Sequence, residues 1–81
     1  MDLVDFTKFL VTSIIKENEN ILVERVENKE NVVEIHIKVC EENMGKIIGK
    51  NGKIINAIRT LVQEASCLRE NQYVKIEIEK L

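Results

Sequence analysis

Proline and tryptophan are absent from this chain of 81 residues, and glycine occurs only three times. No apolar run approaches the about 20 residues that a membrane-spanning helix needs. The N-terminal stretch MDLVDF places acids where a signal peptide carries its basic region. We therefore expect no targeting segment and a cytoplasmic location. A chain of this length is expected to form one domain, residues 1–81.

Histidine and cysteine are too scarce for a metal centre. His36 is the only histidine, and Cys40 and Cys67 lie far apart without a CxxC pair, whereas structural zinc uses four Cys or His ligands at short spacings. A disulfide between the cysteines stays open, but two buried free thiols in a reducing compartment are the simpler interpretation. We expect no metal and no other cofactor.

Aromatic residues are also few. Phe6, Phe9 and Tyr73 are the only ones, and both phenylalanines belong to the apolar stripe of the first predicted helix. RRM and OB domains stack bases on aromatic residues of their strands. The sequence predicts no such stacking surface.

Apolar residues recur at helical spacing over residues 2–17 and 53–68, and a shorter helical segment is predicted at 41–48. Asp2 is expected to cap the first helix, with Asp5 in a position typical of a capping box. Apolar and polar residues alternate over 32–39 and 73–79, which predicts two strands. A third strand is predicted over 21–27, where the alternation is broken once; a bulge or a strand with apolar residues on both sides would explain the break. Turns are expected near 18–20 and 28–31.

The element order α-β-β-α-α-β predicts an α+β fold. A tight turn makes the first two strands antiparallel, and a two-helix crossover returns the third strand parallel. The apolar faces then meet in two layers, with the helices on one face of a three-stranded mixed sheet. We expect the core face of the long helix to comprise Ile54, Ile58, Leu61, Ala65 and Leu68.

Ile55 and Val62 lie beside that predicted core face, two turns apart. A small protein seldom leaves such an apolar flank bare. We expect Val62 to help form a protein interface, in a homodimer or with a partner. The alternative is that Val62 packs at the edge of the core under the first helix.

All three glycines lie within the stretch MGKIIGKNGKII, residues 44–55, together with Lys46, Lys50 and Lys53. Between residues 43 and 63 there are four basic residues and no acid, and removing them from the net charge of −2 leaves −6 for the rest. A local basic patch on an acidic body attracts a polyanion at one face.

Gly49 and Gly52 are expected to bound a tight turn between the two predicted helices. A backbone without side chains allows another chain to approach closely, and the first amides of the following helix favour an anion. The pattern predicts a phosphate contact; a plain helix–helix turn with solvated lysines is the alternative. The Walker A and dinucleotide fingerprints both require glycines at positions where this stretch has other residues.

IIGKNGKII preceded by MGK and followed by AIRTLV, within this element order, resembles the I-G-x-x-G signature of a KH domain in its bacterial, type II arrangement. Nearly the whole chain is similar to the small stand-alone KH proteins of the KhpA (YlqC) family, with the GxxG loop at residues 49–52. The resemblance implies a non-catalytic RNA-binding protein, such as a post-transcriptional regulator or RNA chaperone. It would hold about four nucleotides of single-stranded RNA in a groove beside the loop.

Carried onto this chain, the resemblance implies three groups of RNA-binding residues. The loop itself comprises Gly49, Lys50, Asn51 and Gly52. The apolar walls of the groove would be Ile47, Ile48 and Ile55, and the flanking charge would come from Lys46, Lys53 and Arg59. The family is also associated with a larger KH-containing partner, KhpB or Jag.

Two other functions stay open. In a DNA-binding helix-turn-helix, the long helix would present Lys53, Asn56, Arg59 and Gln63 to bases, although the neighbouring elements here are strands. In a protein-interaction module the loop would be structural and the flank of Ile55 and Val62 would bind a partner. The sequence shows no paired acid and base and no activated nucleophile. We therefore expect neither an enzyme nor a small-molecule substrate, and no membrane contact.

Overall fold

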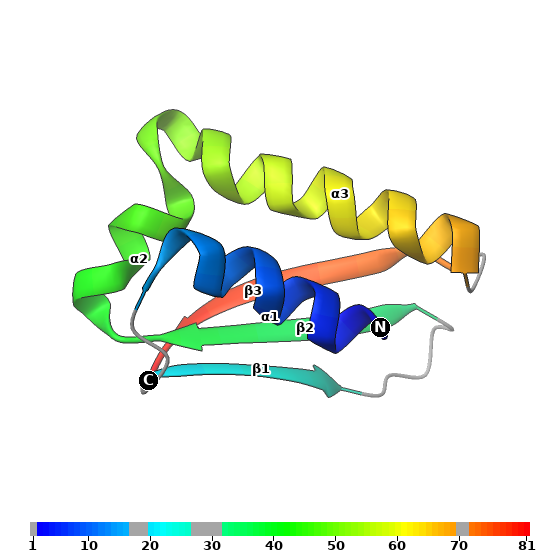
Figure 1. Cartoon of the computed structure of the whole chain (residues 1–81), viewed down its shortest axis with the longest axis horizontal. Coiled ribbons are helices and arrows are strands. Elements are labelled where there is room, and N and C mark those ends of the chain that lie inside the picture. The colour runs from blue at the N-terminus through cyan, green and yellow to red at the C-terminus, as the bar shows by residue number, and fades with distance from the viewer. Residues whose placement is uncertain (1, 17–19, 27–31, 70–71) are drawn as a thin grey trace.

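The computed structural model describes residues 2–16, 20–26, 32–69 and 72–81. Its elements follow the predicted order, with a short 3₁₀ turn between the last two helices. They are α1 (Leu3–Ile14), β1 (Ile21–Val26), β2 (Val33–Val39), α2 (Glu41–Ile48), the turn η1 (Lys50–Gly52), α3 (Lys53–Arg69) and β3 (Val74–Lys80). Helices α1 and α3 lie side by side over one face of the sheet, and α2 lies at one end (Figure 1). The predicted fold class is confirmed.

The sheet has the order β1-β2-β3, with β1 antiparallel and β3 parallel to β2. Every residue of β1 has one partner in β2, from Ile21 opposite Val39 to Val26 opposite Glu34, so the described strand contains no bulge. The inward residues of β2 are buried, as the alternation predicts. The turns expected at 18–19 and 28–31 lie outside the described residues.

Helix α1 begins as predicted, because Asp2 Oδ1 accepts a hydrogen bond from the amide of Asp5 at 2.8 Å. Its buried face is narrower than expected. Thr7 is buried on it and donates its hydroxyl to the carbonyl of Leu3 at 2.7 Å, whereas Phe9 points outward with 56% of its surface exposed.

Helix α3 is rotated relative to the prediction. Its buried residues are Ile55, Ile58, Val62 and Ser66, while Leu61 and Leu68, which we expected in the core, are 49% and 86% exposed. Both apolar stripes have helical spacing and share Ile58, so periodicity alone does not choose between them. The buried stripe ends in a polar residue that is satisfied, since Ser66 Oγ donates to the carbonyl of Gln72 at 2.8 Å.

The rotation overturns the expectation for Val62. Its side chain is fully buried and belongs to the hydrophobic core. Val62 therefore offers no surface to a partner, and the alternative interpretation, a core position, is the one that the structure shows.

The other face of the sheet carries ion pairs. His36 lies on the polar side of β2, with Nε2 2.6 Å from Glu34 and Nδ1 2.7 Å from Glu79 on β3. Carboxylates only accept hydrogen bonds, so both ring nitrogens donate when the imidazole is protonated. The hydrogen bond to Glu34, with further attraction from Glu79, raises the pKa of His36 above its ordinary 6.5.

Among the described residues, no helix combines the length and the apolar character that crossing a bilayer requires. In the same part of the chain, no group of three or more His, Cys, Asp or Glu side chains is placed to hold a metal ion. Both cysteines are free thiols; Cys40 is half-buried, while Cys67 is exposed on α3 rather than buried as expected.

Candidate functional site

The predicted glycine turn ends α2. The amide of Gly49 donates to the carbonyl of Gly45 at 2.9 Å, and Gly49 itself has φ 74° and ψ 177°. Essentially only glycine occupies this backbone region. A Cβ on Gly49 would stand 2.6 Å from Cγ1 of Ile54, so the first turn of α3 packs directly against this glycine. Conformation and packing therefore both require glycine here.

The rest of the turn also uses left-handed backbone. Asn51 has φ 59° and ψ 26°, and Gly52 has φ 75°. Asparagine is one of the few other residues that tolerates this conformation. The amide of Gly52 donates to the carbonyl of Gly49 at 3.3 Å, and that of Lys53 to the carbonyl of Lys50, which closes the turn onto the start of α3.

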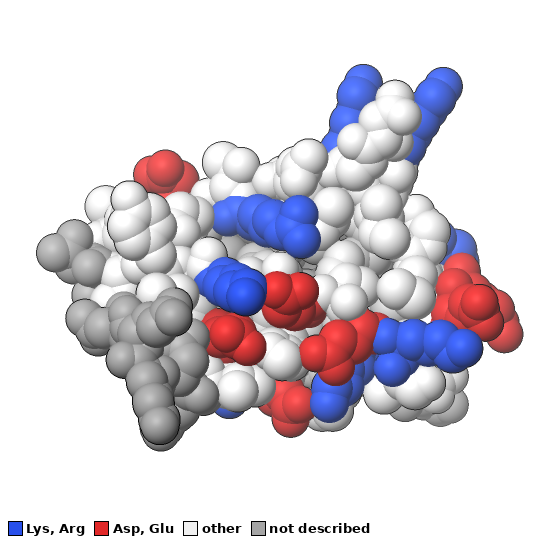
Figure 2. Space-filling view, turned by 180° about the vertical axis from the view of Figure 1, so that it is seen from behind, with Lys and Arg blue, Asp and Glu red and all other residues white. Residues whose placement is uncertain are grey.

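The turn projects from the body and carries positive charge. Lys46, Lys50 and Lys53 are all exposed, and two basic side chains stand on either side of the projecting tip in Figure 2. Most acidic side chains of that face lie away from the tip, mixed with basic ones. The N-terminus of α3, with the partial positive charge of its dipole, points at the same place. The geometry suits a phosphate at the turn.

The predicted apolar walls are only partly available. Ile48 is 37% exposed at the end of α2. Ile47 and Ile55 are buried in the core, because Ile47 lies one turn after the buried Asn43 and Ile55 lies on the buried stripe of α3. The expectation that these two side chains line a groove therefore does not hold; they support the turn from beneath.

Arg59 does not simply flank the turn. It lies on α3, where Nη1 donates to Asn56 Oδ1 and Nη2 to the carbonyl of Ile76, each at 3.3 Å. Arg59 thus joins α3 to β3, one of the two edge strands of the sheet.

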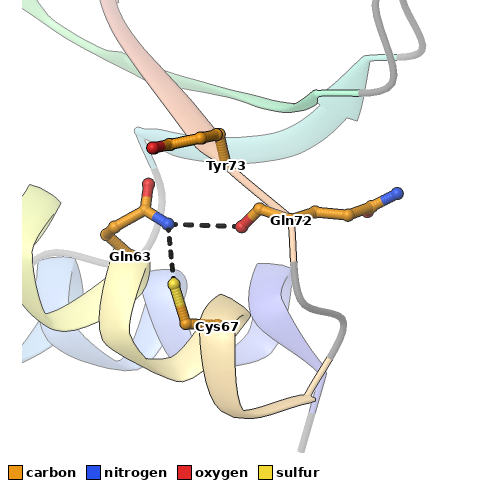
Figure 3. Close-up of a pocket in the computed structure, with 4 residues that line it drawn as sticks. All are labelled: Gln63, Cys67, Gln72 and Tyr73. Atoms are coloured by element: carbon orange, nitrogen blue, oxygen red, sulfur yellow. Dashed lines mark hydrogen bonds between the residues drawn. The ribbon is translucent and has the colours of Figure 1, made fainter.

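Gln63 makes a second link between α3 and β3. Its Oε1 accepts from the amide of Val74 at 2.9 Å, and its Nε2 donates to the carbonyl of Gln72 at 3.2 Å and to Cys67 Sγ at 3.3 Å (Figure 3). With Arg59 and Gln63 held against β3, the helix-turn-helix alternative loses two of its base-reading residues.

A crevice runs between α3 and β3 past these links. One hollow of about 410 Å³ is lined by Arg59, Thr60, Gln63, Glu64 and Val74. A second, of about 240 Å³, is lined by Gln63, Cys67, Gln72 and Tyr73. We name the two hollows together the α3/β3 crevice. The sequence offered Gln63 only as a base reader in the helix-turn-helix alternative and did not indicate Tyr73 as a site residue, because the contribution of both to the crevice depends on how α3 and β3 pack.

The fold is also found in larger proteins. Era from Aquifex aeolicus, in a variant bound to GDP·AlF4−, matches with a TM-score of 0.71 and 19% identity over 96% of this chain. Era in complex with MgGDPNP and nucleotides 1506–1542 of 16S ribosomal RNA matches with a TM-score of 0.72 and 20% identity. This chain spans only 29% of the length of either Era chain.

Closer relatives are similar in length to this chain. The RNA-binding protein KhpA of Clostridium perfringens is 36% identical over 74 residues, which cover 91% of this chain and 96% of that protein. The RNA-binding protein KhpA of Oceanobacillus iheyensis is 38% identical over 69 residues, 85% of this chain and 89% of that protein. A family model described as KhpA/KhpB, KH domain, matches residues 4–78. The chain belongs to the KhpA/KhpB family of KH domains.

Proposed function

We propose that this protein binds single-stranded RNA without catalysis, with the RNA backbone at the Gly49–Gly52 turn and the bases along the α3/β3 crevice. The observation that carries the proposal is the turn itself, where bare backbone, three exposed lysines and the start of α3 meet. The relatives named RNA-binding proteins, and the Era structure that contains ribosomal RNA, support the same ligand class.

The turn provides the phosphate contacts. A phosphate can approach the backbone at Gly49 and Gly52 closely, because neither residue has a side chain in the way. Lys46, Lys50 and Lys53 supply the charge, and Asn51, held in its left-handed conformation, presents an amide at the tip. These contacts are independent of base sequence.

The crevice offers polar groups to bases. In β3 the odd-numbered residues pair with β2, as the bonds from Val33 to Tyr73 and from Leu81 to Val39 show. Ile76 and Ile78 therefore direct their backbone groups toward the open edge of the sheet. Arg59 donates to the carbonyl of Ile76 at that edge, and Ile48 is exposed at the end of α2, next to the turn. From Lys53 to Gln63 the helix rises about 15 Å, which suits the about four nucleotides that a KH groove holds.

The function in the cell would follow from short, weakly selective contacts. A four-nucleotide site carries little sequence information, so the protein would act on many RNAs, as a post-transcriptional regulator or an RNA chaperone in the cytoplasm. No cofactor or small-molecule substrate enters this proposal.

The test is Lys50→Asp, measured by fluorescence anisotropy with a labelled 12-nucleotide RNA of random sequence. Lys50 is exposed at the tip, so the fold should persist. We expect the Kd to rise at least about tenfold, which corresponds to about 1.4 kcal/mol. Lys8→Asp, an exposed position on α1 with the same change of charge, is the control and should leave the Kd near that of the wild type. Equal affinities of the two variants would contradict the proposal.

We also propose that a second copy of this chain binds at the apolar surface formed by Leu61 and Leu68 of α3. Leu61 and Leu68 lie two turns apart on α3, beside a hollow between α1 and α3 that is lined by Leu3, Phe6, Ala65 and Arg69. Monomeric proteins seldom expose several large apolar side chains together. This surface replaces the one predicted at Val62.

Leu68→Glu tests the dimer, because the side chain is 86% exposed and its replacement leaves the core intact. Sedimentation should show a dimer for the wild type and a monomer for the variant, while Leu22→Glu, exposed on β1, should remain a dimer. A wild type that is monomeric at high concentration contradicts the homodimer. Binding of a KhpB- or Jag-like protein by that monomer would assign the surface to the larger partner instead.

A further inference from the structure

Tyr73 lies at the far end of the α3/β3 crevice, with 77% of its surface exposed. Its ring lies above the amide of Gln63, while the side chain of Gln72 extends to the other side (Figure 3). The hollow below the ring is bounded by Gln63 and Cys67 on α3. The ring therefore contributes little to the packing of the core.

The backbone that carries the ring is held firmly. The carbonyl of Tyr73 accepts from the amide of Val33 at 2.8 Å, which fixes it to β2. The preceding carbonyl, of Gln72, accepts from both Ser66 and Gln63. The following amide, of Val74, donates to Gln63. A side chain displayed from such a fixed position loses less entropy when it binds a ligand.

We propose that Tyr73 is a stacking platform for one nucleobase of the bound RNA, seated in the hollow of about 240 Å³ over Gln63 and Cys67. The proposal rests on the proposed RNA binding and adds a base-binding residue at the end of the crevice remote from the turn. Base–aromatic stacking tolerates every base, because each has a π face.

The chemistry of the hollow favours a base over a phosphate. Its four lining residues include no lysine or arginine. The amide of Gln63 is already engaged on both sides, by Val74 through its oxygen and by Gln72 and Cys67 through its nitrogen. The floor is thus a satisfied polar surface that can be covered by a flat ring without leaving a donor or acceptor unpaired.

The distance from the turn fits a single bound strand. Cys67 lies 14 residues after Lys53 on the same helix, and this separation corresponds to about 21 Å. The base on Tyr73 is therefore the one farthest from the nucleotide at Gly49–Gly52. An RNA strand that starts at the turn must therefore run the whole length of the crevice before one of its bases reaches Tyr73.

The composition of the chain supplies a specific probe. Tyr73 is the only tyrosine and there is no tryptophan, so intrinsic tyrosine fluorescence reports on this residue alone. Titration with the random 12-nucleotide RNA, corrected for RNA absorbance, should quench this fluorescence with the same Kd that anisotropy gives. Tyr73→Ala should weaken binding about 5- to 150-fold, the equivalent of the about 1–3 kcal/mol that stacking contributes.

Matched variants separate stacking from other effects. Tyr73→Phe keeps the ring and should bind like the wild type. Leu22→Ala removes another exposed apolar side chain, on β1, and should leave RNA affinity unchanged. On a 12-nucleotide RNA that lacks all its bases, Tyr73→Ala should have no effect, since no base remains to stack.

The outcomes distinguish this inference from the function on which it rests. RNA binding that Lys50→Asp weakens but that neither quenches tyrosine fluorescence nor responds to Tyr73→Ala overturns the stacking platform alone. A wild type that binds no RNA overturns both. An effect of Tyr73→Ala that persists on the base-free RNA also overturns stacking and assigns Tyr73 a contact with the sugar–phosphate backbone.

Discussion

Alanine substitution at the three glycines should change stability in three different ways, beginning with a gain at Gly45. This residue lies in α2 without positive φ, and nothing outside its own stretch of helix lies within 4 Å of where its Cβ would stand. Glycine in a helix interior is about 0.5–1 kcal/mol less favourable than alanine. Gly45→Ala should therefore raise the free energy of unfolding by about that amount.

Gly52 should show a moderate loss. Its φ is 75°, and a Cβ there would meet Asn56 Nδ2 at 3.6 Å, an ordinary contact. Only the left-handed backbone opposes a side chain at this position. Gly52→Ala should lower the free energy of unfolding by about 1–2 kcal/mol.

Gly49 should show the largest loss, because two effects add. Its backbone conformation is reserved for glycine, so the strain on an alanine there should lower the free energy of unfolding by about 1–3 kcal/mol. The Cβ would also stand 2.6 Å from Ile54 Cγ1. Such overpacking should lower the free energy of unfolding by a further amount of about 1–3 kcal/mol. A domain of this size has a total stability of only about 4–12 kcal/mol, so Gly49→Ala should remove a large share of it.

Thermal unfolding followed by far-UV circular dichroism measures all three changes, with 1 kcal/mol equal to about 4–8 °C in Tm. Ile54→Ala removes two of the three atoms nearest the new Cβ, Cγ1 and Cδ1. In that background Gly49→Ala should therefore be less destabilising. Equal losses at Gly49 and Gly52, or no rescue by Ile54→Ala, would refute the packing of α3 against the turn.

Two further predictions concern charge. When the logarithm of the RNA association constant is plotted against the logarithm of salt concentration, the slope should be about −2. Lys50→Ala should make this slope shallower by about 0.7, because each phosphate contact of a single strand contributes about that much. A slope steeper than about −5 would mean that many of the contacts lie outside the turn. Because the pKa of His36 is raised in the folded state, its stabilising effect should be fully present below pH 6.5, the ordinary value, and should be lost as the pH rises through the folded-state pKa. The difference in Tm between wild type and His36→Gln should shrink in that direction, and a difference that grows would contradict the ion pairs with Glu34 and Glu79.

Much of the fold could be predicted because local patterns and tertiary packing agree. The clean alternation of β2 and the cap at Asp2 depend on neighbouring residues only, and the structure shows both. The direction of each strand follows from the lengths of the connections between them. These features required no knowledge of which helix face meets the sheet.

The face of α3 could not be predicted, because that choice is tertiary. Two stripes of apolar residues compete on this helix, and the buried one ends in Ser66, a residue that a sequence pattern places outside. The hydroxyl is satisfied only because the carbonyl of Gln72 lies opposite it. That partner belongs to the segment before β3, beyond the reach of helical periodicity. The prediction for Val62 failed for the same reason.

The two halves of the candidate site differ in the same way. The turn was predictable because its function resides in the backbone, and the residues with positive φ, Gly49, Asn51 and Gly52, are types that tolerate it. The crevice was not, because Gln63 and Tyr73 are ordinary residues until α3 and β3 pack together. A site that depends on unusual backbone, such as the glycine turn, can be recognised in the sequence. A site formed between an ordinary helix and an ordinary strand can be recognised only once the fold is known. Substitutions at Gly49 and Gly52 should therefore affect stability and RNA binding together, while substitutions at Tyr73, which is exposed and outside the core, should affect RNA binding alone.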